Sequence, residues 1–170
     1  MIKSSILLFV FVIVVITGCE NSRLDLLKAG DKAPEFALKD VNGGVVSLSD
    51  FKDRVVLLEF WSMWCMGCRA SIPFLNTMRY TFKESELTVI ALNVDAKDFN
   101  SQVKSYVKQN SMTYPIVLSV ESLNESYGIS VLPTMYLLDK KHNIAQKYLG
   151  FYPQLYELMP QKIKELLKGV

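Results

Sequence analysis

Two cysteines separated by two residues, Cys65 and Cys68, form the most reactive pattern in the chain. Thiols at this spacing can close a disulfide across one helical turn, and either can exchange with a disulfide of another molecule. The pair falls where an apolar run gives way to a segment of helical periodicity. A helix N-terminus has unpaired N–H groups and the positive end of the helix dipole, which both favour an anionic sulfur. We therefore expect Cys65 to be the nucleophile and Cys68, one turn further in, to be the resolving thiol.

A carboxylate in the middle of the preceding apolar run is the second unusual feature. Glu59 lies within Val55–Trp61, and a buried carboxylate is costly unless it is neutral or paired. Burial would raise its pKa and make it available for proton transfer. The alternative is a carboxylate at the edge of the strand, paired with a lysine such as Lys52.

Strands and helices alternate around this motif. Apolar runs at 36–38 and 45–48 flank Asn42-Gly43-Gly44, which predicts an N-terminal β-hairpin. The continuous run 55–61 predicts a strand covered on both faces, and apolar residues at helical spacing predict a helix over 66–84. Further strands are predicted at 87–94, 116–120, 135–138 and 144–149. Further helices are predicted at 99–110 and 153–168, with a short one after residue 120 that ends at Tyr127-Gly128.

Two residues of the C-terminal part carry specific expectations. Pro160 lies inside the last predicted helix, where we expect a break or the start of a second helix. His142 lies in a lysine-rich turn, where we expect it to be solvated. Alternating strands and helices followed by a hairpin and a helix indicate an α/β fold, with a mixed central sheet and helices on both faces.

Length and charge limit the function further. A chain of 170 residues has room for one ordinary domain, and half of its residues are hydrophobic. The formal net charge of +2 includes no basic cluster, so we expect no nucleic-acid partner. A metal centre is not expected either, because zinc needs more ligands than two thiols and one distant histidine provide.

The first eighteen residues have the features of an export signal. Lys3 precedes an apolar run over 6–16, about 16 Å of helix and too short to span a bilayer. Ile16-Thr17-Gly18-Cys19 resembles the bacterial lipobox, which implies lipidation of Cys19. The expected organisation is a lipoprotein signal peptide at 1–18, a tether at 19–30 and one domain at 31–170. An uncleaved anchor or an ordinary signal is the alternative. Lipidation of Cys19 would leave Cys65 and Cys68 as the two free thiols, and export would place them outside the cytoplasm.

Residues 30–168 resemble the TlpA/ResA-like extracytoplasmic branch of the thioredoxin superfamily, a group with an AhpC/TSA-Redoxin-like domain. The matching stretches are Gly30–Phe36, Val55–Cys68, Pro73, Asn93–Asp95, and Tyr127-Gly128 through Leu132-Pro133-Thr134.

The resemblance implies a thioredoxin-like fold and several roles. Pro133 would be the family's cis-proline beside the cysteines, with the Leu132 backbone pairing with substrate. Trp64 would contact substrate, and Glu59 would take the proton of the resolving thiol. Ser71 stands where some members have a second acid.

These features predict a membrane-anchored thiol–disulfide oxidoreductase that works as a reductant. The redox-active pair Cys65 and Cys68 would carry out the electron transfer, and no other cofactor is expected. The resemblance implies that it reduces exported proteins such as apocytochrome c and receives electrons from a membrane thiol carrier, and we expect it to be a monomer. A thiol peroxidase is the enzymatic alternative, since Ser62 lies three residues before Cys65. The cysteine pair could also be a structural disulfide, or belong to a binding module that only holds a partner.

Overall fold

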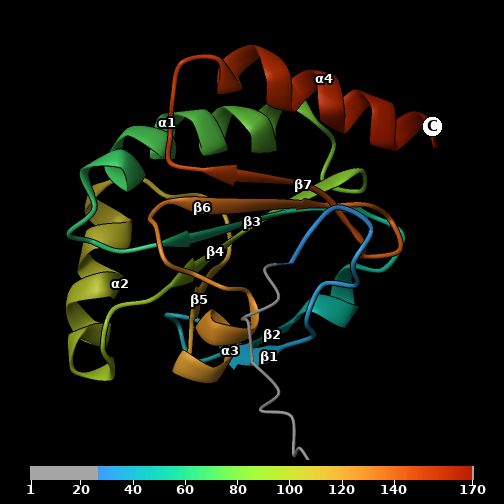
Figure 1. Ribbon diagram of the computed structural model, residues 1–170. Coiled ribbons are helices and arrows are strands. Elements are labelled where there is room, and N and C mark those ends of the chain that lie inside the picture. Colours follow the sequence, from blue (N-terminus) through green and yellow to red (C-terminus); the bar gives the residue numbers. More distant parts are fainter. Residues whose placement is uncertain (1–26, 170) are drawn as a thin grey trace, which may run out of the picture.

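The computed structural model describes residues 27–169, which form two β-sheets and four α-helices (Figure 1). In chain order the elements are β1 (Ala37–Lys39), β2 (Val45–Ser47), the 3-10 helix η1 (Leu48–Phe51), β3 (Val55–Trp61), α1 (Met66–Thr81), β4 (Leu87–Asn93), the 3-10 helix η2 (Lys97–Phe99), α2 (Asn100–Gln109), β5 (Ile116–Leu118), α3 (Glu121–Ser126), β6 (Thr134–Leu138), β7 (Ile144–Leu149) and α4 (Leu155–Lys168).

The main sheet is mixed, with the strand order β5-β4-β3-β6-β7. Strand β3 runs parallel to β4 and antiparallel to β6, so it is hydrogen-bonded along both edges. All seven of its residues are buried, as its continuous apolar run predicted. The carboxyl end of β3, where the chain continues towards α1, is therefore held rigidly in position by the sheet.

Helices cover both faces of the main sheet. Buried side chains of α1, α2 and α4 form one core with residues 55, 57 and 61 of β3. Residues 56, 58 and 60 face a second core made with η1 and α3. Figure 1 shows α1 and α4 on one side of the sheet, and α3 with the β1–β2 hairpin on the other. The predicted mixed α/β fold and N-terminal hairpin are confirmed.

The prediction of a break at Pro160 was wrong, because α4 continues through it. Leu155, Met159 and Ile163 are fully buried on either side of the proline and hold the helix against the sheet. The hydrogen bond that proline lacks would have joined the carbonyl of Tyr156, a residue that is 53% exposed. Water can reach this side of the helix, so the loss is tolerated.

The expectation that His142 is solvated was also wrong. Its side chain is buried, and its Nε2 lies 3.1 Å from the carbonyl oxygen of Phe51. The residue has φ 58°, in a turn where Asp139 accepts hydrogen bonds from the N–H groups of Lys141 and Asn143. The ring therefore lies against the end of η1, a contact with a distant element that the polar composition of the segment concealed.

Candidate active site

Cys65 and Cys68 are joined by a disulfide at the N-terminus of α1, with their Cα atoms 5.2 Å apart. Cys65 is the N-cap residue, and its sulfur accepts a hydrogen bond from the N–H of Cys68 at 3.0 Å. Cys65 is half-buried, whereas Cys68 is only 2% exposed. The first sulfur is thus the accessible one, and the helix N-terminus that surrounds it stabilises negative charge.

A proline on a neighbouring loop closes one side of the cysteine motif. The Leu132–Pro133 peptide bond is cis, and Pro133 is buried directly before β6. A Cβ atom placed on Gly67 would lie 3.2 Å from Cδ of Pro133, so the start of α1 lies against the proline ring. Only a residue without a side chain allows this approach without displacing the ring.

Apolar side chains at least partly open to solvent also lie near the motif, next to Cys65 and directly before Pro133 in the chain. Trp64 is 73% exposed, and its ring meets Phe99 edge-on at a centroid distance of 6.1 Å. Leu132 is half-buried, and the preceding Val131 is exposed. Side chains of this kind next to an accessible sulfur can contact an apolar segment of a polypeptide.

Glu59 lies in the interior of the protein. It belongs to the central strand β3, is completely buried, and has no lysine partner within residues 27–169, so the interpretation as an edge carboxylate paired with Lys52 is wrong. One carboxyl oxygen, Oε1, is hydrogen-bonded to the Ser71 hydroxyl, while Oε2 has no partner in the described part of the chain. Burial raises the pKa of Glu59 to about 8, although the Ser71 hydrogen bond lowers it.

Ser71 connects this carboxyl group to the second cysteine. Its hydroxyl contacts both Oε1 of Glu59 and the carbonyl oxygen of Cys68, the latter at 2.7 Å. A hydroxyl has one hydrogen and cannot donate fully to two acceptors. A protonated Glu59 resolves the conflict, since its O–H can donate to Ser71 while Ser71 donates to Cys68. In the disulfide form this geometry therefore favours a protonated Glu59, as does its raised pKa.

The turn between β3 and α1 is held by a residue that follows β4. Asp95 accepts hydrogen bonds from the Ser62 hydroxyl at 2.6 Å and from the N–H of Met63 at 2.9 Å. The Ser62 oxygen also accepts from the N–H of Trp64 at 3.1 Å. A peroxidase would need the Ser62 hydroxyl for peroxide, but here both Asp95 and the backbone already engage it.

Two further side chains near the motif, Trp61 and Arg69, lie in different surroundings. Trp61 is buried in the core beside Tyr106, and Arg69 on the surface of α1 is 3.4 Å from the hydroxyl of that tyrosine. Cys19 lies outside the described residues. Sequence reasoning missed the contacts of Ser71 and Asp95. The polar segment Asn93-Val94-Asp95 was a usable signal, because it follows a strand parallel to β3 and must meet the same end of the sheet.

Metal-binding clusters and membrane-spanning helices are both absent from the described part of the chain. Over residues 27–169, no group of three or more histidine, cysteine, aspartate or glutamate side chains could hold a metal ion. No helix within this range is both long and apolar enough to cross a membrane.

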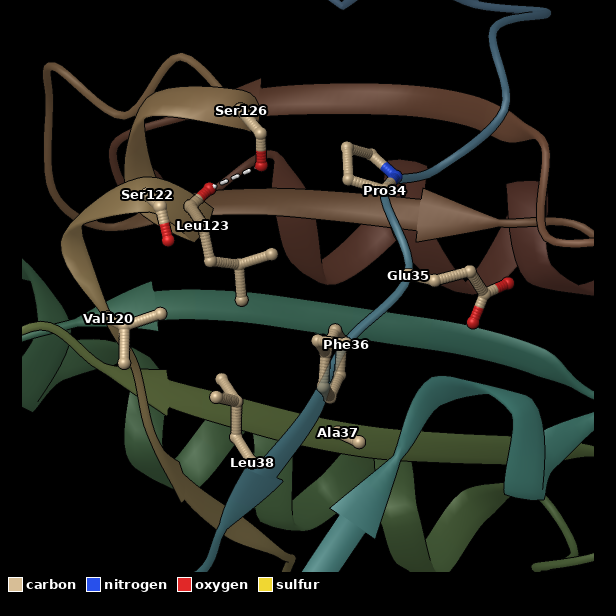
Figure 2. Close-up of a pocket in the computed structure, with 9 residues that line it drawn as sticks. All are labelled: Pro34, Glu35, Phe36, Ala37, Leu38, Val120, Ser122, Leu123 and Ser126. Atoms are coloured by element: carbon tan, nitrogen blue, oxygen red, sulfur yellow. Dashed lines mark hydrogen bonds between the residues drawn. The ribbon is translucent and has the colours of Figure 1, made fainter.

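A pocket of about 370 Å³ lies on the opposite side of the sheet from α1, between the segment leading into β1 and the helix α3 (Figure 2). Glu35 is its one ionisable lining residue, and the Ser126 hydroxyl is already donated to the Leu123 carbonyl at 2.8 Å. Its lining includes neither cysteine. The disulfide lies instead at the start of α1.

The fold and the cysteine site together define a thioredoxin-fold thiol–disulfide oxidoreductase. Residues 29–147 match the model of the AhpC/TSA family, and the chain belongs to this family. It is 29% identical to the thiol-disulfide oxidoreductase ResA of Bacillus cereus over 99% of this chain and 98% of that protein. It is 33% identical to the thioredoxin-like protein YneN of Bacillus subtilis over 73% of each chain.

A solved structure agrees with these relatives. The crystal structure of a putative thiol:disulfide interchange protein DsbE from Chlorobium tepidum superposes with a TM-score of 0.77 at 34% identity, covering 83% of this chain and 99% of that one. The expected placement in the TlpA/ResA-like part of the thioredoxin superfamily is confirmed. The protein is an enzyme of thiol–disulfide exchange.

Proposed function

We propose that this protein is a membrane-anchored reductant of disulfides in exported proteins, acting through Cys65 and Cys68. The observation that carries the proposal is the geometry of the pair. One sulfur is accessible and lies at a helix N-terminus, and the other is buried one turn away within bonding distance. This asymmetry supports attack by Cys65 and resolution by Cys68.

The proposed cycle begins with the reduced enzyme. The Cys65 thiolate attacks one sulfur of a substrate disulfide, so that a Cys65–substrate bond forms and the other substrate sulfur leaves and takes a proton. The Cys68 thiolate then attacks Cys65, closes the intramolecular disulfide and releases the second substrate thiol. The substrate gains two electrons and the enzyme loses two, which a membrane thiol carrier would restore.

Glu59 is the proposed proton acceptor for Cys68. The proposal is supported by Ser71, which links the Glu59 carboxyl group to the backbone carbonyl of Cys68, the residue that must lose its thiol proton before resolution. A pKa near 8 leaves a minor fraction of Glu59 ionised at neutral pH and able to accept that proton, and this fraction grows as the pH rises towards 8. Pro133 and the Leu132 backbone, with the exposed Trp64 ring, would guide the substrate to the accessible sulfur.

The proposed location is the outer side of a bacterial membrane, to which a lipid on Cys19 would attach a monomer. Its support is the lipobox-like Ile16–Cys19 after a short apolar run. In addition, the pneumococcal exposed lipoprotein thioredoxin Etrx1 has the same fold, with a TM-score of 0.67 at 26% identity. Apocytochrome c is the proposed substrate on the strength of the TlpA/ResA-like resemblance alone.

Trapping of mixed disulfides tests the exchange mechanism. Cys68→Ser should accumulate covalent adducts with substrates because the resolving thiol is missing, and mass spectrometry of the adducts names the substrates. Cys65→Ser should form none and should fail to reduce insulin. Adducts on Cys65→Ser but not on Cys68→Ser would reverse the two assignments. If the adducts trapped on Cys68→Ser do not include apocytochrome c, the proposal of that substrate is wrong.

Metabolic labelling with a radioactive fatty acid tests the anchor. The wild-type chain should incorporate the label and sediment with membranes, whereas Cys19→Ser should do neither. An unlabelled wild-type chain in the soluble fraction would contradict the lipoprotein assignment and leave the exchange chemistry unaffected.

A further inference from the structure

The turn between β3 and α1, which carries Cys65, is fixed by hydrogen bonds to Asp95, a residue that follows β4. In the three residues before α1, the backbone N–H groups of Met63, Trp64 and Cys65 are bound by Asp95, the Ser62 hydroxyl and the Ser62 carbonyl, respectively. The Ser62 hydroxyl is in turn fixed by its donation to Asp95 at 2.6 Å. The side chain of Asp95 therefore determines two of these three contacts, one directly and one through Ser62.

Asp95 is itself held in place. Its Oδ2 accepts a further hydrogen bond from the Asn93 amide at 2.8 Å, and the Asn93 side-chain oxygen accepts from the Asp95 N–H at 3.2 Å. Asn93 is the buried last residue of β4 and pairs with Trp61, the last residue of β3. A rigid parallel strand pair thus carries the carboxylate to the turn.

The charge of Asp95 has no cationic partner within residues 27–169, where the one ion pair joins Lys162 and Glu165. Met63, which contacts the carboxylate, is two residues before Cys65, a separation of at most about 7 Å along the chain. The carboxylate is hydrogen-bonded to this nearby backbone, and a screening length of about 8 Å at physiological ionic strength weakens its field without abolishing it, so part of that field reaches the Cys65 sulfur. It opposes the helix N-terminus, because like charges disfavour ionisation.

We propose that Asp95 is a positioning residue for Cys65, and that its negative charge limits how far the Cys65 sulfur is ionised. The inference rests on the proposed role of Cys65 as nucleophile. In this proposal the N-terminus of α1 stabilises the Cys65 thiolate and the charge of Asp95, just after β4, destabilises it. The ionised fraction of Cys65 depends on both effects.

Asp95→Asn tests the charge, since the amide keeps the size and one carbonyl acceptor of the carboxylate. In the reduced full-length chain, the pKa of Cys65, measured from the pH dependence of alkylation, should fall by about 0.5, a change of about threefold in its dissociation constant. Asp98→Asn is the matched control: it removes the same charge from an exposed residue of η2 and should leave the pKa unchanged. An unaltered pKa in Asp95→Asn would overturn the proposal.

Asp95→Ala tests the positioning. Above pH 10, where the thiol is ionised in every variant, Asp95→Asn should exchange with a peptide disulfide at close to the wild-type rate, and Asp95→Ala about tenfold more slowly. Equal rates for the two would refute the positioning role. If the alanine variant does not fold, the pKa of the asparagine variant decides. All these variants keep both cysteines, so their outcome is separate from the trapping test of the exchange itself.

Discussion

At the scale of single residues, two opposing effects act on the Glu59 carboxyl group. Its complete burial disfavours the charged form, and the hydrogen bond from Ser71 favours it. Burial is the larger effect and holds the pKa near 8, against an ordinary value of 4.5. The folded disulfide form therefore keeps a proton on Glu59 over a pH range in which the unfolded chain has released it.

This difference predicts a pH-dependent stability. The stabilisation from the raised pKa is fully present below about pH 4.5 and is lost as the pH rises to about 8. Glu59→Gln should remove this dependence, because the amide mimics the protonated carboxyl group and does not titrate. Urea unfolding of the oxidised proteins from pH 4 to 9 measures it, with the exposed Glu84→Gln as control. The same slope in Glu59→Gln and wild type would contradict the burial argument.

Ionisation of Glu59 should also affect the rate of the second exchange step. If Glu59 accepts the proton of Cys68, release of the mixed disulfide should accelerate as the pH rises through 8, where the carboxylate forms. Glu59→Gln should slow this step about tenfold or more and abolish its rise with pH. Stopped-flow measurement of the second exchange step separates it from attack by Cys65. An unchanged profile in Glu59→Gln would assign the proton to another acceptor.

At the scale of elements, packing overrides local preference in α4. The buried residues on both sides of Pro160 keep one continuous helix, although the proline supplies no N–H to it. The helix therefore lacks one internal hydrogen bond at Pro160. Replacing this proline should stabilise the protein, since proline is about 3 kcal/mol less favourable than alanine inside a helix and the half-buried ring recovers part of this by packing.

Pro160→Ala should accordingly raise the free energy of unfolding by about 1–2 kcal/mol. Chemical denaturation measures the change, and disulfide exchange should keep its wild-type rate because α4 lies away from the cysteines in sequence and contributes no residue to the turn before α1. A variant less stable than wild type would mean that the packing of the proline ring outweighs the missing hydrogen bond.

At the scale of the whole molecule, the three inner strands form the most protected part of the fold. Every residue of β3, β4 and β6 is buried, and each of these strands is paired along both edges. The β1–β2 hairpin is a separate two-stranded sheet with exposed residues in both strands. The cysteine motif is thus attached to the stable part of the molecule.

Hydrogen exchange should reveal this hierarchy. Amides of β3, β4 and β6 should exchange only with global unfolding, and those of the hairpin at least about tenfold faster. Mass spectrometry of peptides from the oxidised protein resolves the two groups. Equal protection of the hairpin and β3 would show that the two sheets open as one unit.

Much of this architecture was determined by the sequence alone. A continuous apolar run must be buried on both faces, and an Asn-Gly turn between apolar segments closes a hairpin, so β3 and the β1–β2 pair were predictable. The Cys65–Cys68 spacing at the strand–helix junction likewise determined the disulfide and the class of chemistry, because these depend on residues close together in the chain.

The tertiary structure decided what depends on residues far apart in the chain. Glu59 and Ser71 are twelve positions apart, and Asp95 is thirty-three after Ser62, so only strand register and helix packing bring them together. The burial of His142 and the unbroken helix at Pro160 were decided in the same way, by contacts with elements that local sequence does not specify. Local patterns encode elements and reactive motifs, whereas the contact of Glu59 with Ser71 and that of Asp95 with Ser62 arise from packing between elements.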